Sequence, residues 1–180
     1  MRRLVVNLIA ISALLAGFYL SARYYSEPIN VAPQSSSGNS LLGSFRPDFS
    51  LVSNKNELVT PADYSGKTLL INFWATWCAP CRHEMPMLMD LQRTYGSKGL
   101  QIVGIALDDA QSVRSFVETY GISYPILMGV EDVFATSAAY GNVEGVLPYS
   151  VLVDKEGIVR WQYEGIIQNE KISSLLSDLL

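Results

Sequence analysis

Residues Phe73 to Pro86 read FWATWCAPCRHEMP and contain both cysteines of the chain, Cys78 and Cys81. The pair follows a nearly continuous apolar run, TLLINFWA at 68–75, which is typical of a strand buried on both faces. Residues 79–95 then carry a helix-like pattern that stops at Gly96. The sequence therefore predicts that the two thiols lie where a buried strand gives way to the start of a helix.

The spacing of Cys78 and Cys81 suits a bond that opens and closes. Residues i and i+3 on a helix share a face, with Cβ atoms about 5–6 Å apart, and a disulfide needs Cα atoms about 4.4–6.8 Å apart. At the helix N-terminus Cys78 also meets unpaired backbone N–H groups and the positive end of the helix dipole. Both favour the thiolate, which is the attacking species, so the pattern indicates a reactive Cys78.

Two other readings of the cysteine pair are less favoured. A purely structural disulfide usually links distant segments, because a loop this short gives little entropic stabilisation. A structural zinc site needs four ligands, and the chain offers Cys78, Cys81 and one histidine, His83, which points away from the face shared by the cysteines. We therefore expect a redox pair, with no metal and no cofactor, and a surface position for His83.

The rest of the sequence predicts an α/β fold with a central mixed β-sheet flanked by helices on both sides. Residues 46–67 read as an N-terminal β-hairpin with NKNE at its tip. Strands are expected at 100–107 and 123–128, helices at 108–121 and 131–141, a second hairpin around DKEG in 149–165, and a closing amphipathic helix at 169–180.

The first residues differ in character from this domain. Arg2 and Arg3 precede an apolar run at 4–20 that is long enough to span a bilayer as a signal anchor. A cleaved signal peptide is the alternative, but Leu20 is too large for the position that the cleavage rule assigns it, and tyrosines follow where an aromatic belt would lie. We favour a transmembrane signal-anchor helix at 1–25, with the rest of the chain outside the cytoplasm.

Composition sets the remaining boundaries. Residues 26–44 are rich in Pro, Ser, Gly and Asn and read as a flexible linker, which leaves 45–180 as the folded domain. The formal net charge is −4 and 49% of residues are hydrophobic, so the chain can bury a core. This acidic balance gives no sign of the basic surface that nucleic-acid-binding proteins carry.

The segment FWATWCAPCRHEMP resembles the active-site motif of the thioredoxin superfamily, W-C-x-x-C-x-x-E-x-P. More narrowly, the chain resembles the membrane-tethered TlpA/ResA-like thiol–disulfide oxidoreductases, from RPDFSL near Phe45 to the C-terminus and including GVLPYSVLVDKEGIVRWQYEG. The resemblance implies a thioredoxin-like fold with a cis peptide between Leu147 and Pro148, which would line the substrate groove. The sequence alone fits an ordinary trans proline equally well.

The resemblance also implies roles for the motif residues. Cys78 would attack a partner disulfide, Cys81 would resolve the mixed disulfide, and Trp77 would flank the reactive sulfur as a contact surface for substrate. Asn72 stands where thioredoxin has a buried, titrating Asp. Glu84, at i+3 from Cys81, is therefore expected to exchange protons with the pair; the alternative is an ordinary acid in an early helical turn, favoured by the dipole.

The function implied is an extracytoplasmic reductase of protein disulfides, of the cytochrome c biogenesis type, acting on substrates such as apocytochrome c. It would lie on the periplasmic side of a bacterial inner membrane, as a single-pass protein served by a separate transmembrane electron donor. A thiol oxidase is an alternative, because small free-energy differences set the reduction potential of the cysteine pair and hence the direction of the reaction. A copper-handling module also stays open, since thiols favour Cu(I). Peroxidase chemistry is disfavoured by Ala75, where such relatives have Thr or Ser.

Overall fold

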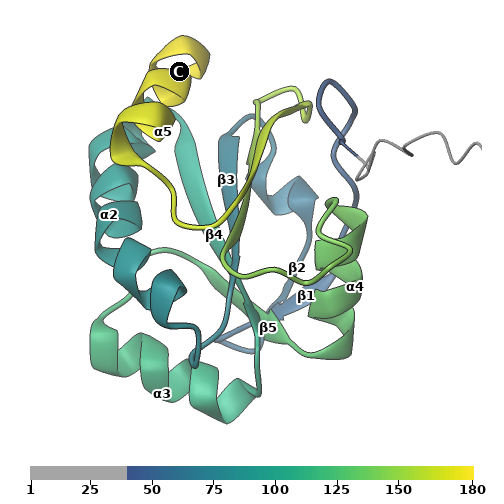
Figure 1. Cartoon of the computed structure of the whole chain (residues 1–180), viewed down its shortest axis with the longest axis vertical. Helices are drawn as coiled ribbons and strands as arrows, with labels where there is room; N and C mark the ends of the chain where they lie inside the picture. Colours follow the sequence, from purple (N-terminus) through teal and green to yellow (C-terminus); the bar gives the residue numbers. More distant parts are fainter. Residues whose placement is uncertain (1–39) are drawn as a thin grey trace, which may run out of the picture. The chain divides into compact units, whose positions relative to one another are not determined.

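A computed structural model describes residues 40–180, which form an α/β domain built on one sheet with strand order β2-β1-β5-β4-β3-β6-β7 (Figure 1). The strands are β1 (Leu51–Ser53), β2 (Leu58–Val59), β3 (Thr68–Trp74), β4 (Leu100–Leu107), β5 (Ile126–Gly129), β6 (Tyr149–Val153) and β7 (Val159–Glu164). The helices are α2 (Ala79–Tyr95), α3 (Ala110–Tyr120), α4 (Glu131–Ala139) and α5 (Asn169–Leu179), with short 3-10 turns η1 (Pro61–Tyr64) and η2 (Gly96–Lys98).

The sheet is mixed, as the sequence predicts. Strands β3, β4 and β5 run parallel, whereas β6 pairs antiparallel with β3 and β7 pairs antiparallel with β6. The predicted N-terminal hairpin is present as β1 and β2, and β1 also pairs antiparallel with β5, so the hairpin extends the main sheet. The predicted second hairpin is β6–β7.

Helices cover both faces of the sheet because the central strands are apolar on both faces. Along β3 the side chains alternate: Leu70 and Trp74 belong to the core under α2, α3 and α5, whereas Ile71 and Phe73 belong to the core on the α4 side. All four side chains are fully buried. This double burial explains why residues 68–75 read as a continuous apolar run rather than an alternating one.

The chain upstream of Phe45 is attached to the edge of the sheet. Gly43 N–H donates to the carbonyl of Val159 at 2.8 Å, and Val159 N–H donates to the carbonyl of Ser44 at 2.9 Å. Phe45 bridges to Ile158. Leu41, whose N–H donates to the Gln162 side chain at 2.8 Å, also contacts the domain, so described residues of the segment 26–44 that was expected to be linker pack on the sheet.

The expected signal anchor at 1–25, and the expected linker as far as residue 39, lie outside the described residues. Within 40–180, none of the helices combines the length and apolar character that crossing a bilayer requires.

Candidate active site

The two cysteines form a disulfide at the N-terminus of α2. Their Cα atoms are 5.3 Å apart, within the range expected from the i, i+3 spacing. Cys78 is the N-cap of the helix, and the N–H of Cys81 points at its Sγ over 3.2 Å. A sulfur in this position accepts one of the backbone N–H groups that a helix leaves unpaired, and the same contact stabilises a thiolate once the disulfide is reduced.

Access to the disulfide is one-sided. Cys81 is fully buried, while Cys78 keeps 5% of its surface exposed and the neighbouring Trp77 keeps 67%. Cys78 is therefore the sulfur that a partner molecule reaches, and Trp77 lies beside it as exposed apolar surface. Trp74, in contrast, is fully buried.

The segment before β6 borders the same end of β3. The Leu147–Pro148 peptide bond is cis, as the resemblance implied. Tyr149 pairs with Phe73, so Pro148 lies level with Trp74, where the chain leaves β3 towards the cysteines. Leu147 packs against the hydrophobic cluster that contains Cys78 and Cys81. The proline loop and the disulfide thus lie at the same end of the sheet, where β3 ends.

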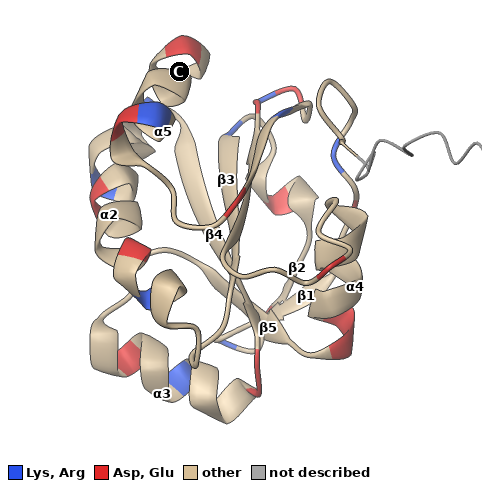
Figure 2. Cartoon of the chain, in the orientation of Figure 1, with Lys and Arg blue, Asp and Glu red and all other residues tan. Residues whose placement is uncertain are grey.

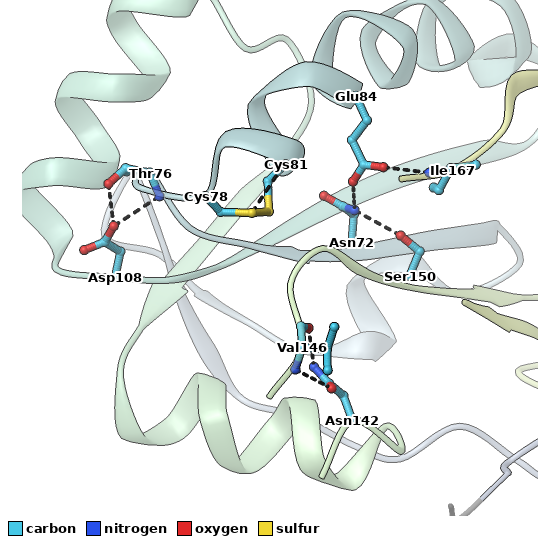
Figure 3. Close-up of a disulfide and its surroundings, with 10 residues drawn as sticks. All are labelled: Asn72, Thr76, Cys78, Cys81, Glu84, Asp108, Asn142, Val146, Ser150 and Ile167. Atoms are coloured by element: carbon cyan, nitrogen blue, oxygen red, sulfur yellow. Dashed lines mark hydrogen bonds between the residues drawn. A yellow bond between two sulfur atoms is a disulfide. The ribbon is translucent and has the colours of Figure 1, made fainter. Parts of the chain in front are cut away.

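Glu84 lies buried beneath α2 rather than on the helix surface, with only 2% of its area exposed. One carboxylate oxygen accepts a hydrogen bond from the Asn72 side-chain amide at 2.7 Å, and the other accepts from the backbone N–H of Ile167 at 3.0 Å (Figure 3). A carboxyl group held on both oxygens in the core is not an ordinary solvated acid of an early helical turn.

The environment of Glu84 makes it a candidate proton carrier. Burial raises the pKa of this carboxyl above its ordinary value, and the hydrogen bonds from Ile167 and Asn72 only partly offset that rise. A buried carboxyl whose pKa is raised holds its proton to a higher pH than an exposed carboxyl does, and it can exchange that proton with a neighbouring group. Burial also raises the pKa of Tyr124, and the negative charge of Glu84 adds to that rise, so the charge of Glu84 acts on this part of the core.

Three hydrogen bonds around Glu84 were not expected from the sequence: those from Asn72 and Ile167 to Glu84, and that from Asn72 to Ser150. The Asn72 amide that donates to Glu84 also donates to the Ser150 hydroxyl at 3.0 Å, which links β3 to β6. Ile167 lies 83 positions from Glu84 in the chain, and no local pattern reveals such a contact. The available signal was Asn72 itself, because a polar residue inside a fully buried strand needs partners.

A second carboxylate, Asp108, holds the loop between β3 and Cys78. Its Oδ2 accepts hydrogen bonds from the Thr76 backbone N–H at 3.1 Å and from the Thr76 hydroxyl at 2.5 Å (Figure 3). Asp108 follows β4, and its own N–H donates to the carbonyl of Gly129 at 3.1 Å. The loop that presents Trp77 and Cys78 is thereby fixed to the neighbouring parallel strands.

We expect Asp108→Ala to destabilise the protein by about 1–3 kcal/mol, because the Thr76 N–H and hydroxyl lose a charged acceptor. Urea unfolding of the oxidised protein measures this loss. In a double-mutant cycle, Thr76→Val should remove part of the effect, since the Asp108–Thr76 hydroxyl bond is then already absent. Purely additive costs would show that this hydrogen bond contributes nothing to stability.

The remaining polar residues of the motif lie at the surface. Arg82 and His83 are both exposed, as predicted for His83. Among residues 40–180, no group of three or more His, Cys, Asp or Glu side chains is arranged to hold a metal ion.

Comparison with known proteins gives matches over most of the chain. The model of the AhpC/TSA family matches residues 42–162. The thiol–disulfide oxidoreductase ResA of Geobacillus kaustophilus is 33% identical over 181 residues, covering 99% of this chain and 97% of that protein. The thioredoxin-like protein YneN of Bacillus subtilis is 33% identical over 138 residues, covering 74% of this chain and 78% of that protein.

Solved structures with the same fold carry related descriptions. A thiol:disulfide interchange protein of the thioredoxin family from Chlorobium tepidum superposes with a TM-score of 0.66 at 30% identity, covering 75% of this chain and 94% of that chain. A thiol–disulfide oxidoreductase from Bacteroides fragilis gives a TM-score of 0.67 at 26% identity, covering 76% of this chain and all of that one, 100%.

Proposed function

The chain belongs to the AhpC/TSA family and is a ResA-like thiol–disulfide oxidoreductase of the thioredoxin superfamily, and on this basis we propose that it reduces disulfide bonds of proteins outside the cytoplasm. The observation that carries the proposal is the Cys78–Cys81 disulfide at the start of α2, with a buried carboxyl group, Glu84, on the next turn of the same helix. This arrangement joins a two-electron carrier to a proton carrier.

The reaction begins with the reduced pair. The Cys78 thiolate attacks one sulfur of a partner disulfide, which forms a Cys78–partner mixed disulfide and releases the other partner sulfur as a thiolate. Cys81, once deprotonated, attacks the Cys78 sulfur, which closes the Cys78–Cys81 disulfide and releases the second partner thiolate. Two electrons pass from the enzyme to the partner, and the released thiolates take up protons.

Glu84 serves the second step. Cys81 is fully buried, so burial disfavours its thiolate and the proton needs an acceptor inside the protein. Glu84 is one helical turn further along α2, and Asn72 and Ile167 fix its orientation. Asn72 does not titrate, so the carboxyl on α2 takes the part that the superfamily usually gives to an Asp on the strand.

The cellular setting forms part of the same proposal. The apolar run at 4–20 after Arg2 and Arg3 supports a single-pass anchor in the bacterial inner membrane, with the domain on the periplasmic side. A dithiol that has reduced a partner ends as a disulfide, so it requires two electrons from a separate transmembrane thiol donor. The substrate that we propose is a disulfide between the haem-binding cysteines of apocytochrome c, which the reaction returns to thiols.

The reduction potential of the Cys78/Cys81 couple tests the direction of the reaction. We expect a value near that of thioredoxin, about −270 mV, measured by equilibration with glutathione or dithiothreitol redox buffers. A value near about −120 mV, typical of a strong oxidant, would reverse the assignment and make the protein a thiol oxidase. The Cys78→Ala/Cys81→Ala protein is the control for signals that do not come from the couple.

A further inference from the structure

An exposed apolar surface lies at the N-cap of α4, on α4 itself and on the loop that follows it. Its members are Val130, Phe134, Val143 and Val146, each with 38–57% of its area exposed. The two segments touch, because a Cβ placed on Gly145 would lie 3.2 Å from the Phe134 ring. Asn142 orders the loop by accepting from the N–H of Val146 and donating to its carbonyl, each at 2.9 Å (Figure 3). We call these four residues the α4 patch.

The α4 patch connects to the disulfide from two directions. Its loop runs directly into Leu147 and the cis-proline, which lies level with the end of β3. Its other end, Val130, follows Gly129, whose carbonyl accepts from Asp108, and Asp108 in turn holds Thr76, two residues before Cys78. Main chain and hydrogen bonds therefore join both ends of the α4 patch to the segments that carry Trp77, Cys78 and the cis-proline.

The charge around the α4 patch has one sign. The exposed carboxylates Glu131, Asp132 and Glu144 lie among its residues, and no Lys or Arg occurs between Arg114 and Lys155. None of these carboxylates takes part in an ion pair within residues 40–180. Figure 2 shows the same imbalance, with acidic and no basic colouring on α4 and the loop after it.

We propose that the α4 patch docks the polypeptide segment that flanks the substrate disulfide, and that it selects segments in which apolar residues are interspersed with lysine or arginine. The proposal rests on the proposed reductase function and names the class of substrate protein that it serves. Apolar side chains would cover Phe134 and Val143, while cationic side chains would meet the carboxylates at the rim. Complementary charge at a rim acts mainly on the rate of encounter and on the choice of partner.

Two disulfide-closed peptides of identical apolar sequence test the proposal, one flanked by lysines and the other by glutamates. The pre-reduced full-length protein is mixed with each peptide, and the single-turnover rate constant is followed by tryptophan fluorescence. Exposed ion pairs each contribute modestly, so we expect the lysine peptide to react about tenfold faster at low salt. At about 1 M salt, where screening acts within about 3 Å, the two rate constants should converge.

Two matched variants locate the effect. In Glu131→Gln/Asp132→Asn/Glu144→Gln the preference for the lysine peptide should fall to about twofold or less, because the rim loses its charge. In Glu57→Gln/Glu118→Gln/Asp178→Asn, which removes the same number of exposed carboxylates from the hairpin, α3 and α5, the preference should stay at its original value. A loss of preference in both variants would show that net charge rather than the α4 patch selects the peptide, and would overturn the proposal.

The outcomes separate this proposal from the one on which it rests. Both peptides reduced at equal rates would overturn docking at the α4 patch and leave the reductase function intact. Neither peptide reduced, by a protein whose thiols are shown to be free, would overturn both. A faster reaction with the glutamate peptide would also contradict the assigned preference.

Discussion

Cys78→Ser is expected to abolish disulfide exchange, lowering the rate by more than about 10³-fold, because the serine hydroxyl is not an effective nucleophile without an activating base. Cys81→Ser should behave differently. Its Cys78 can still attack a partner, but the mixed disulfide has no internal thiol to resolve it. The measurement is mass spectrometry of non-reduced samples after mixing each variant with a peptide disulfide.

The difference between the two variants tests which sulfur attacks first. We expect a stable adduct of one peptide chain with Cys81→Ser and none with Cys78→Ser, as the greater exposure of Cys78 requires. His83→Ala, a change at the exposed position beside the pair, should keep the wild-type rate. An adduct that forms on Cys81 as readily as on Cys78 would contradict the assignment of the attacking sulfur.

Glu84→Gln should give the second large effect, a fall of about 10²-fold in the rate at which the mixed disulfide resolves at neutral pH. The physical reason is that Cys81 is buried and Gln cannot accept its proton. The rate should recover as pH rises, because hydroxide then removes the proton. Stopped-flow measurement of resolution between about pH 6 and pH 10 separates this step from the initial attack.

Stability should also depend on pH through Glu84. Folding raises the pKa of this carboxyl, so the folded protein binds its proton more tightly than the unfolded chain does. The stabilisation from that bound proton is fully present below the ordinary carboxyl pKa and is lost as pH rises through the raised folded pKa. Glu84→Gln has no such proton to lose. The free energy of unfolding of the wild type should therefore rise relative to that of the variant as pH falls.

Serial urea unfolding of the oxidised proteins from about pH 4 to pH 8 checks the sign. Glu170→Gln, which neutralises an exposed acid in the first turn of α5, is the comparison for an ordinary helix-terminal carboxylate. If Glu84→Gln changed neither the resolution profile nor the stability profile, Glu84 would be a structural acid alone.

The parts of the fold that could be predicted from sequence are those with local signals. The continuous apolar run of β3, the glycine at the end of α2 and the turn inside the β6–β7 hairpin each depend on neighbouring residues. The position of Cys78 at the start of a helix also followed from local pattern. The cis-proline did not, because Pro148 fits either isomer locally and only the family resemblance distinguished them.

The surroundings of the site required the tertiary structure. Glu84 could be singled out as a motif residue, but its burial depends on Ile167 and Asn72, which reach it from the last loop and from the strand below. Thr76 and Asp108 meet because β3 and β4 are parallel neighbours with fixed register. Such contacts are set by sheet order, which local periodicity does not encode.

The short turn after β7 has a consequence for how the site can vary. The N–H of Gly165 donates to the carbonyl of Pro148 at 2.8 Å, and two residues later the N–H of Ile167 donates to Glu84. One stretch of main chain therefore supports both the cis-proline segment and the Glu84 carboxylate. Replacing this turn with that of a relative would alter both contacts at once. The choice of partner and the pH dependence set by Glu84 should therefore change together.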